Sequence, residues 1–155
     1  MKTINCKEAP IKVFGIPFFY EKKNFTRLPD KLCNILAGSG CGRRCPGARI
    51  GFRTNAKTFT VKTKLKTLSV DVGMSIYACQ SIAVMIGDRS DPVFAGLASP
   101  PDYNTKVFEH TFEKSSEMEE VTLWLLRNEE IEDIELTFPD DALIEEPTPY
   151  KYGPA

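Results

Sequence analysis

Hydrophobic and polar residues alternate with a period of two along much of the chain. Between residues 58 and 66, Phe59, Val61 and Leu65 fall on one side. The other side carries Thr58, Thr60, Lys62, Lys64 and Lys66. Side chains of a β-strand point alternately to two faces, so this pattern predicts a strand with one buried face. Residues 48–53 predict a second strand. We expect the turn at residues 54–56 to join the two as a hairpin.

Further short strands are expected at residues 68–78, 81–86, 93–98, 106–112, 121–126 and 134–138. Turns separate them roughly every 8–12 residues, which is typical of a sandwich or barrel. The strand at 121–126 is apolar on both faces and is therefore expected at the centre of a sheet. We find no long helical period and no internal repeat. These patterns predict an all-β fold, either a sandwich or a barrel.

The 155 residues are enough for one domain with a single core, which the ten phenylalanines are expected to fill. Residues 1–47 are rich in proline and glycine and predict a loop-rich segment packed on the domain. Within it we expect a short strand or extended segment near residues 14–19 and one helical turn at residues 30–36. Residues 48–139 form the predicted sandwich, and residues 140–155 a proline-rich tail or linker.

Charge is unevenly distributed along the chain. Residues 1–112 carry 17 Lys and Arg against 8 Asp and Glu, a net of +9, whereas residues 113–155 carry 3 against 13, a net of −10. A nucleic-acid patch is one explanation, but the basic residues alternate with threonine and apolar residues, as on a solvated sheet face. The two halves could also pair with each other in the fold. Nucleic-acid binding is therefore disfavoured.

No apolar run approaches the roughly 20 residues of a membrane helix, so we expect no membrane partner. The N-terminal segment MKTINCKEAPIKVFG also lacks the continuous apolar region of a signal peptide or lipoprotein leader. We therefore expect a cytoplasmic location.

Catalytic chemistry has few candidates. His110 is the only histidine, and Phe108 and Phe112 flank it at two-residue spacing, so we expect a core or cleft residue and not a general base. The glycine-rich residues 38–42 do not follow a clear strand or open a helix, which argues against a phosphate-binding loop. The acidic pairs are expected to be solvated, including Glu119-Glu120, Glu129-Glu130, Asp140-Asp141 and Glu145-Glu146.

Three aromatic residues near the end of the chain have different expected roles. Trp124 lies between Leu123 and Leu125, so core packing is favoured over a platform for a sugar ring. Tyr150 and Tyr152 lie in a proline-bounded tail with little else that is apolar. We expect both tyrosines to dock, either onto this domain or onto a partner.

The five cysteines are too few and odd in number for a disulfide framework. Cys41 and Cys45, with Cys33 upstream, could supply part of a zinc site, but such a site needs four ligands and no second close pair is present. We therefore expect free thiols in a flexible loop, and neither a metal nor another cofactor.

Four segments of the chain match sequence motifs of one known protein family, in the same order. Residues 47–56 read GARIGFRTNA and resemble GGRIRFRTDS. Residues 93–101 read VFAGLASPP and resemble FVGSFRPP. Residues 119–139 resemble REITINLPLYNPVKSLEIGLP, and residues 144–151, IEEPTPYK, resemble the linker IEPPPPYK. Taken together, the segments resemble the N-terminal sandwich domain of a group of SGNH/GDSL-type esterases, and the fold expected on this basis is an antiparallel β-sandwich of jelly-roll type.

The resemblance covers roughly residues 10–152, with one notable departure. The family's GxDLY-like strand corresponds to residues 81–85, SIAVM, where Gly, Asp and Tyr are all replaced. The family's catalytic Ser, Gly, Asn and His blocks are absent from this chain. The resemblance therefore implies an accessory domain whose catalytic domain is missing here.

On this basis we expect a non-catalytic module of a carbohydrate esterase that packs on a catalytic domain and shapes its site. The partner would be an SGNH catalytic domain, in cis or in trans, or a second copy of the chain. A free-standing carbohydrate- or protein-binding module is the alternative, and an esterase in its own right is a weaker third. Candidate contact residues are Tyr150, Tyr152 and His110.

Overall fold

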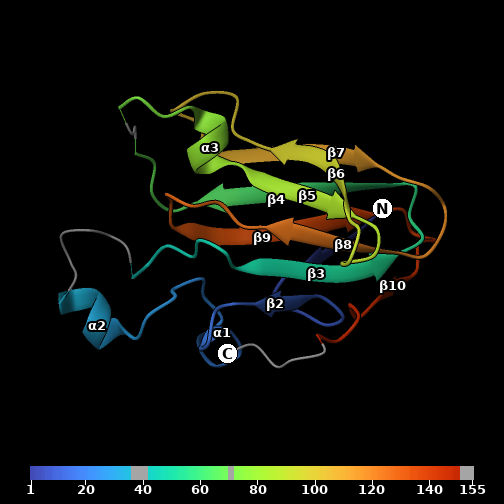
Figure 1. Cartoon of the computed structure of the whole chain (residues 1–155), viewed down its shortest axis with the longest axis horizontal. Helices are drawn as coiled ribbons and strands as arrows, with labels where there is room; N and C mark the ends of the chain where they lie inside the picture. The colour runs from blue at the N-terminus through green and yellow to red at the C-terminus, as the bar shows by residue number, and fades with distance from the viewer. Residues whose placement is uncertain (36–41, 70–71, 151–155) are drawn as a thin grey trace.

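The computed structural model of the chain describes residues 1–35, 42–69 and 72–150 (Figure 1). Its strands form two antiparallel sheets that pack face to face. One sheet has the order β1 (Lys2–Asn5), β9 (Ile131–Phe138), β4 (Thr58–Leu65) and β7 (Val107–Glu113). The other has the order β10 (Ile144–Glu145), β3 (Arg49–Thr54), β8 (Glu119–Trp124), β5 (Ile82–Ile86) and β6 (Val93–Ala98), and β2 (Lys12–Phe14) also pairs with β3.

The connectivity is that of a jelly roll. With the short strands β2 and β10 set aside, the four-stranded sheet holds the first, eighth, third and sixth strands of the described chain. The facing sheet holds the second, seventh, fourth and fifth. This arrangement nests two Greek keys, so the predicted all-β sandwich of jelly-roll type is confirmed. The N-terminal segment also contributes to the sandwich, because β1 forms an edge of the four-stranded sheet.

The expected hairpin at residues 48–66 is wrong, although both strands exist. β3 pairs with β8 in one sheet, and β4 pairs with β7 and β9 in the other. The turn between them is a corner where the chain changes sheets. The Thr54 hydroxyl fixes this corner, since it accepts from the Ala56 amide (3.1 Å) and donates to the Leu143 carbonyl (2.8 Å). Period-two alternation identifies a buried face but does not identify the partner strand.

Phenylalanines from both sheets fill the space between them. Phe52 of β3 makes edge-on contacts with Phe59 of β4 and Phe138 of β9, with ring centroids 5.7 and 5.5 Å apart. Phe59 also stacks on Phe112 of β7 at 5.6 Å. Each of these rings is buried, and such pairs add to the energy of apolar burial. The two sheets are therefore joined by one aromatic core.

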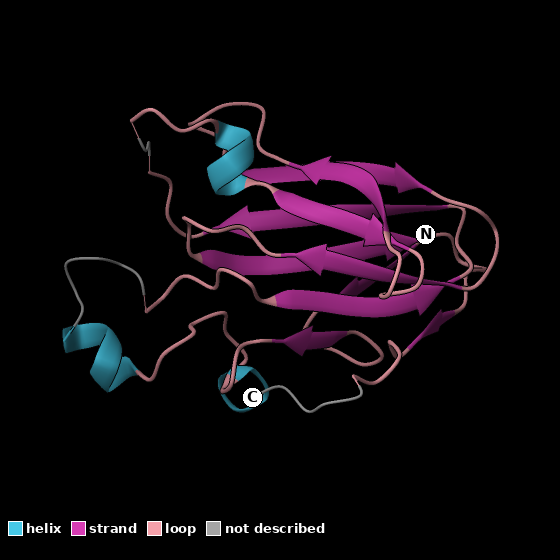
Figure 2. Cartoon of the chain, viewed as in Figure 1, coloured by secondary structure: helices cyan, strands magenta, loops and turns pink. Residues whose placement is uncertain are grey.

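Among the described residues, three short helices lie outside the two sheets: α1 (Phe19–Lys22), α2 (Asp30–Ile35) and α3 (Ile76–Gln80) (Figure 2). The helical turn expected at residues 30–36 is confirmed by α2 up to Ile35. The strand expected over residues 68–78 is wrong where the structure describes it, because α3 begins there. Ser75 caps this helix by accepting from the Ala78 amide, and Gly73 with φ +84° turns the chain just before it. The alternating Met74 and Ile76 therefore do not lie on a strand.

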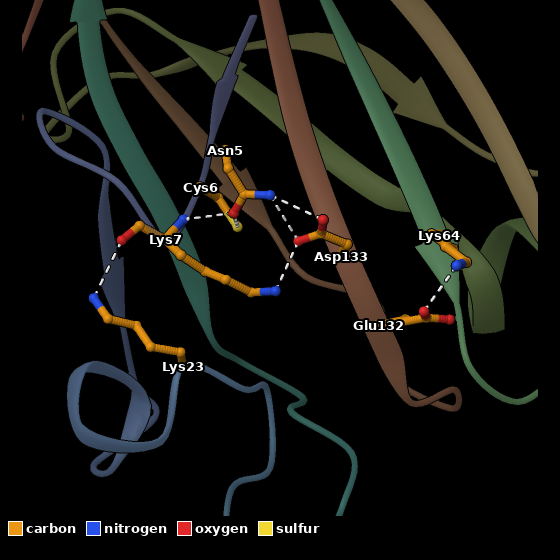
Figure 3. Close-up of polar contacts among 7 residues, drawn as sticks. All are labelled: Asn5, Cys6, Lys7, Lys23, Lys64, Glu132 and Asp133. Atoms are coloured by element: carbon orange, nitrogen blue, oxygen red, sulfur yellow. Dashed lines mark hydrogen bonds and ion pairs between the residues drawn. The ribbon is translucent and has the colours of Figure 1, made fainter.

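A polar cluster fastens β1 to the sandwich (Figure 3). The Asn5 amide donates to both carboxylate oxygens of Asp133 (2.9 Å each), and Lys7 Nζ pairs with Asp133 at 2.9 Å. The Asn5 side chain in turn accepts from the Lys7 backbone amide at 3.0 Å. Burial alone would raise the pKa of Asp133, but the contacts from Lys7 and Asn5 outweigh burial and lower it.

We expect Asp133→Asn to lower the free energy of unfolding at pH 7 by less than about 1 kcal/mol, because the pair with Lys7 is partly exposed. A carboxylate with a lowered pKa stabilises the fold above its unfolded pKa, and this contribution is lost as the pH falls through its folded pKa. The difference between variant and wild type should therefore narrow below about pH 4. Urea unfolding at pH 7 and pH 3 measures the free-energy difference between Asp133→Asn and wild type. If this difference is the same at both pH values, the ionised Asp133 carboxylate does not stabilise the fold as described.

Candidate interaction surface

The outer face of the four-stranded sheet is covered by paired charges. Lys62 and Lys64 of β4 lie 3.3 and 2.8 Å from Glu135 and Glu132 of β9. These are pairs between the basic and acidic parts of the sequence, as one of the expectations from the charge distribution proposed. Exposed pairs of this kind belong to a solvated face.

The outer face of the six-stranded sheet has a different character. The strand registers place two rows of residues across it, Arg49–Trp124–Ala83–Leu97 and Gly51–Thr122–Met85–Phe94. The rows begin with an arginine and a glycine on β3 and become apolar toward β6. Phe94 is 58% exposed and Trp124 is 42% exposed. This face therefore presents large apolar side chains to solvent.

The expectation that Trp124 packs in the core is wrong. Its neighbour Leu123 points inward and is fully buried, and alternation along β8 places Trp124 on the opposite face. The central position expected for this strand is correct, because β8 lies between β3 and β5. The sequence neighbours Leu123 and Leu125 are buried in the core, whereas the Trp124 ring lies on the outer face of the sheet.

The C-terminal tail crosses part of this outer face as a strap, defined here as residues 144–150. The strap begins as β10, which pairs with Thr54 and Arg53 of β3. Pro147 then lies over Gly51, where an added Cβ would be only 3.1 Å from the proline ring. A glycine at this position thus allows the strap to approach the sheet closely.

Two charged residues outside the strap, Glu120 and Arg89, hold it in place. The Glu120 carboxylate accepts from the Thr148 amide at 3.0 Å and pairs with the Arg89 guanidinium at 2.5 Å. Glu120 is only 7% exposed, so the expectation that this acidic pair is solvated is wrong for Glu120. The strap covers this carboxylate and shields it from solvent. Because the strap lies far from Glu120 in the sequence, the residues around Glu120 do not predict its burial.

Tyr150 ends the described strap and docks onto this domain. Its ring centroid lies 3.9 Å from the Arg89 guanidinium and 4.8 Å from that of Arg49, and its ring meets Phe14 edge-on at 4.9 Å. Arg49 also lies over the Trp124 ring at 4.9 Å. Cation–π contacts stabilise by about 0.5–2 kcal/mol each, so Tyr150 is one of the anchors of the strap. Tyr152 lies outside the described residues.

A hollow of about 730 Å³ lies beside the strap and is lined by residues that include Arg53, Arg89, Ser90 and Tyr150. Ser90 hydrogen-bonds the Asp88 carboxylate, but among the described residues no histidine or lysine lines the hollow to act as its base. The described lining offers charge and aromatic surface.

His110 lies on β7, opposite Val61 of β4, and is exposed. Its ring contacts Phe112 at 4.8 Å, while Phe112 itself is buried. β7 is an edge strand, so an inward-facing position on it can remain open to solvent. The expected packed-core position is wrong for His110, because the residue is exposed. A contact role for His110 stays a prediction.

The acidic pair at residues 129–130 also contains a buried member. Glu129 is 0% exposed, and its carboxylate accepts from the Ser69 amide and hydroxyl (2.8 and 2.7 Å), Thr67 Oγ1 (2.8 Å) and Gln80 Nε2 (3.1 Å). The expectation of a solvated pair is therefore wrong for Glu129. This carboxylate joins the segment after β4 to α3 and to the turn before β9, and it has a structural role.

The cysteines expected in a flexible loop are packed where they are described. Cys33 lies in α2 and Cys45 precedes β3, and both are buried without a disulfide. Within residues 1–35, 42–69 and 72–150, no His, Cys, Asp and Glu side chains gather as metal ligands. Cys41 lies outside these ranges. No helix in the described part of the chain is long and apolar enough to cross a membrane.

Burial raises the pKa of both Cys6 and Cys45 to about 12. Since the thiolate is the reactive form, we expect neither thiol to react with an aromatic disulfide reagent at pH 8 while the chain is folded. Both should react after unfolding in guanidinium chloride. Mass spectrometry of the labelled peptides measures this, and labelling of folded Cys45 at the denatured rate would show that it is accessible.

The fold of this chain is shared by proteins of known structure. No protein-family model matches the chain, and a search of curated proteins finds no match. Solved structures that share the fold include two proteins named for lipase and acyltransferase activities. One is a putative GDSL-like lipase from Bacteroides ovatus ATCC 8483, with a TM-score of 0.79 and 18% identity over 95% of this chain. The other is the salicylyl-acyltransferase SsfX3 from a tetracycline biosynthetic pathway, with a TM-score of 0.68 and 14% identity over 97%.

The similarity to these two proteins is a similarity of fold, because the sequence identities are only 18% and 14%. The chain covers 43% of each of these two proteins, so it spans less than half of their length. It therefore has the architecture of a part of each.

Proposed function

We propose that this chain is a non-catalytic accessory domain of an SGNH-type carbohydrate esterase. The observation that carries the proposal is the match of 95% of this chain to 43% of a putative GDSL-like lipase. In such an arrangement the jelly roll packs on a separate hydrolase domain, joined to it or bound in trans. The enzyme's nucleophile would lie in that other domain.

The geometry of the strap supports this role. Tyr150 contacts Arg49, Arg89 and Phe14, which fix its position on the surface. A domain joined to the chain after Tyr150 would therefore start from a fixed point. The hollow beside the strap has Arg53 and Arg89 in its lining and would adjoin that exit point. Loops at this position can form one wall of the substrate entrance of a neighbouring active site.

The coding frame beyond Ala155 tests the proposal. We expect it to continue into a strand ending in a Gly-Asp-Ser-like nucleophile motif, and then into the family's later Gly, Asn and His blocks. A stop codon directly after Ala155 would exclude the joined form. If, in addition, no SGNH domain that binds this chain is encoded next to it, the form in which the hydrolase domain is a separate protein is excluded as well.

A free-standing carbohydrate-binding module is the second candidate, and the exposed ring of Trp124 favours it. Aromatic rings on a sheet can stack on a sugar. A glycan array probed with wild type and Trp124→Ala tests this candidate. Glycans held by wild type and lost by the variant would support it, whereas an array without hits contradicts it.

A further inference from the structure

The part of the outer face that the strap leaves uncovered lies on β5, β6 and β8. We call it the open face and define it as Ala83, Met85, Phe94, Leu97 and Trp124. We propose that the open face is the surface on which the hydrolase domain packs. This inference rests on the proposed function and deepens it by naming the docking surface.

The composition of the open face supports a contact role. Its five residues are uncharged and contiguous in the register, with Ala83 between Trp124 and Leu97, and with Met85 beside Phe94. The outer face of the other sheet instead carries Lys–Glu pairs such as Lys64–Glu132. Phe94 and Trp124 are exposed, and Ala83, Met85 and Leu97 are half-buried. Contiguous apolar surface of this kind on one face of a sandwich marks a contact surface.

The course of the strap points to the same surface. Arg49 contacts both Tyr150 and Trp124, so the last described residue of the strap lies one side chain away from the open face. A domain attached directly after the strap would be held at high effective concentration against this surface. The strap thus covers one part of the outer face, and the attached domain would cover the rest.

The surroundings of Trp124 favour a protein over a sugar. Sugar recognition needs hydrogen-bonding groups around the aromatic ring, but the next residues in its row are Ala83 and Leu97. Arg49 already lies over the Trp124 ring. Apolar side chains with an arginine at their border are typical of the core and rim of a protein interface.

Hydroxyl-radical footprinting, read by mass spectrometry, tests the inference. Oxidation of Trp124 and Phe94 is compared between residues 1–155 alone and the full product of the coding frame or, for a partner in trans, the reconstituted complex. We expect oxidation of both residues to fall at least about fivefold when the hydrolase domain is present. Tyr77, which is exposed on α3, serves as the internal control and should be oxidised equally in both.

A pair of variants of the same longer protein or complex sharpens the test. Phe94→Asp places a charge on the open face and should restore oxidation of Trp124 to its level in the isolated chain. Tyr77→Asp places the same charge on an exposed aromatic position outside the open face and should leave Trp124 protected.

Each result has a distinct meaning. An active hydrolase in which Trp124 and Phe94 stay as reactive as in residues 1–155 overturns the docking surface and leaves the proposed function intact. The absence of any hydrolase domain removes both. Protection in residues 1–155 alone that disappears on dilution would assign the face to a second copy, and protection by added oligosaccharide would assign it to a sugar; either overturns the inference.

Discussion

Replacing Glu129 with alanine is expected to lower the free energy of unfolding by about 3 kcal/mol. The substitution removes a fully buried carboxylate and leaves the donors of Ser69, Thr67 and Gln80 without their acceptor. Each buried donor left unsatisfied costs about 1–3 kcal/mol, although the hydroxyls can turn to other partners. Urea unfolding measures the change as a lower midpoint with an unchanged slope.

Two variants make this test specific. Glu129→Gln keeps one carbonyl acceptor and nearly the same shape, so we expect a smaller loss than for alanine. Glu132→Ala removes a half-exposed carboxylate paired with Lys64, and should cost less than about 1 kcal/mol. If Glu129→Ala and Glu132→Ala destabilise equally, the buried hydrogen bonds do not have the importance assigned to them.

Gly51→Val is expected to lift the strap from the sheet while the sandwich stays folded. Even a Cβ at this position would lie 3.1 Å from Pro147 and 3.2 Å from Phe14, and a branched side chain needs more room than the strap leaves. Overpacking of this kind costs about 1–3 kcal/mol. Because displacement of Pro147 would also loosen Tyr150, chymotrypsin should cleave after Tyr150 several-fold faster in the variant.

Ala83→Val is the matched control for this prediction. It adds bulk to the same outer face, on the part that the strap does not cross. We expect its chymotryptic cleavage after Tyr150 to equal that of wild type. Equal cleavage of Gly51→Val and wild type would show that the strap is not held over Gly51 in solution.

The strands were the most predictable part of the fold. Their alternation results from burying one face, and β4 shows it over eight residues from Thr58 to Leu65. Which strands pair is set by contacts far apart in sequence, so the sequence pattern led to a hairpin where the chain in fact changes sheets. The jelly-roll connectivity was expected on the basis of the family resemblance in addition to alternation.

The candidate surface was only partly predictable. Docking of Tyr150 was expected because an aromatic residue in a polar, proline-rich tail needs a partner. Its partners Arg49 and Arg89 could not be named, since both lie far earlier in the chain. Glu120 and Glu129 were misjudged because their burial comes from distant segments that fold over them.

The central proposal, that this chain is a non-catalytic domain of a larger esterase, is tested most directly by hydrolysis of nitrophenyl acetate. Equal molar amounts of the 155-residue chain and of the hydrolase that contains or binds it are compared in the same buffer. We expect the chain alone to show no turnover above buffer and the longer protein or complex to be active. Turnover by the purified 155-residue chain, at a rate that scales with its concentration, would contradict the claim.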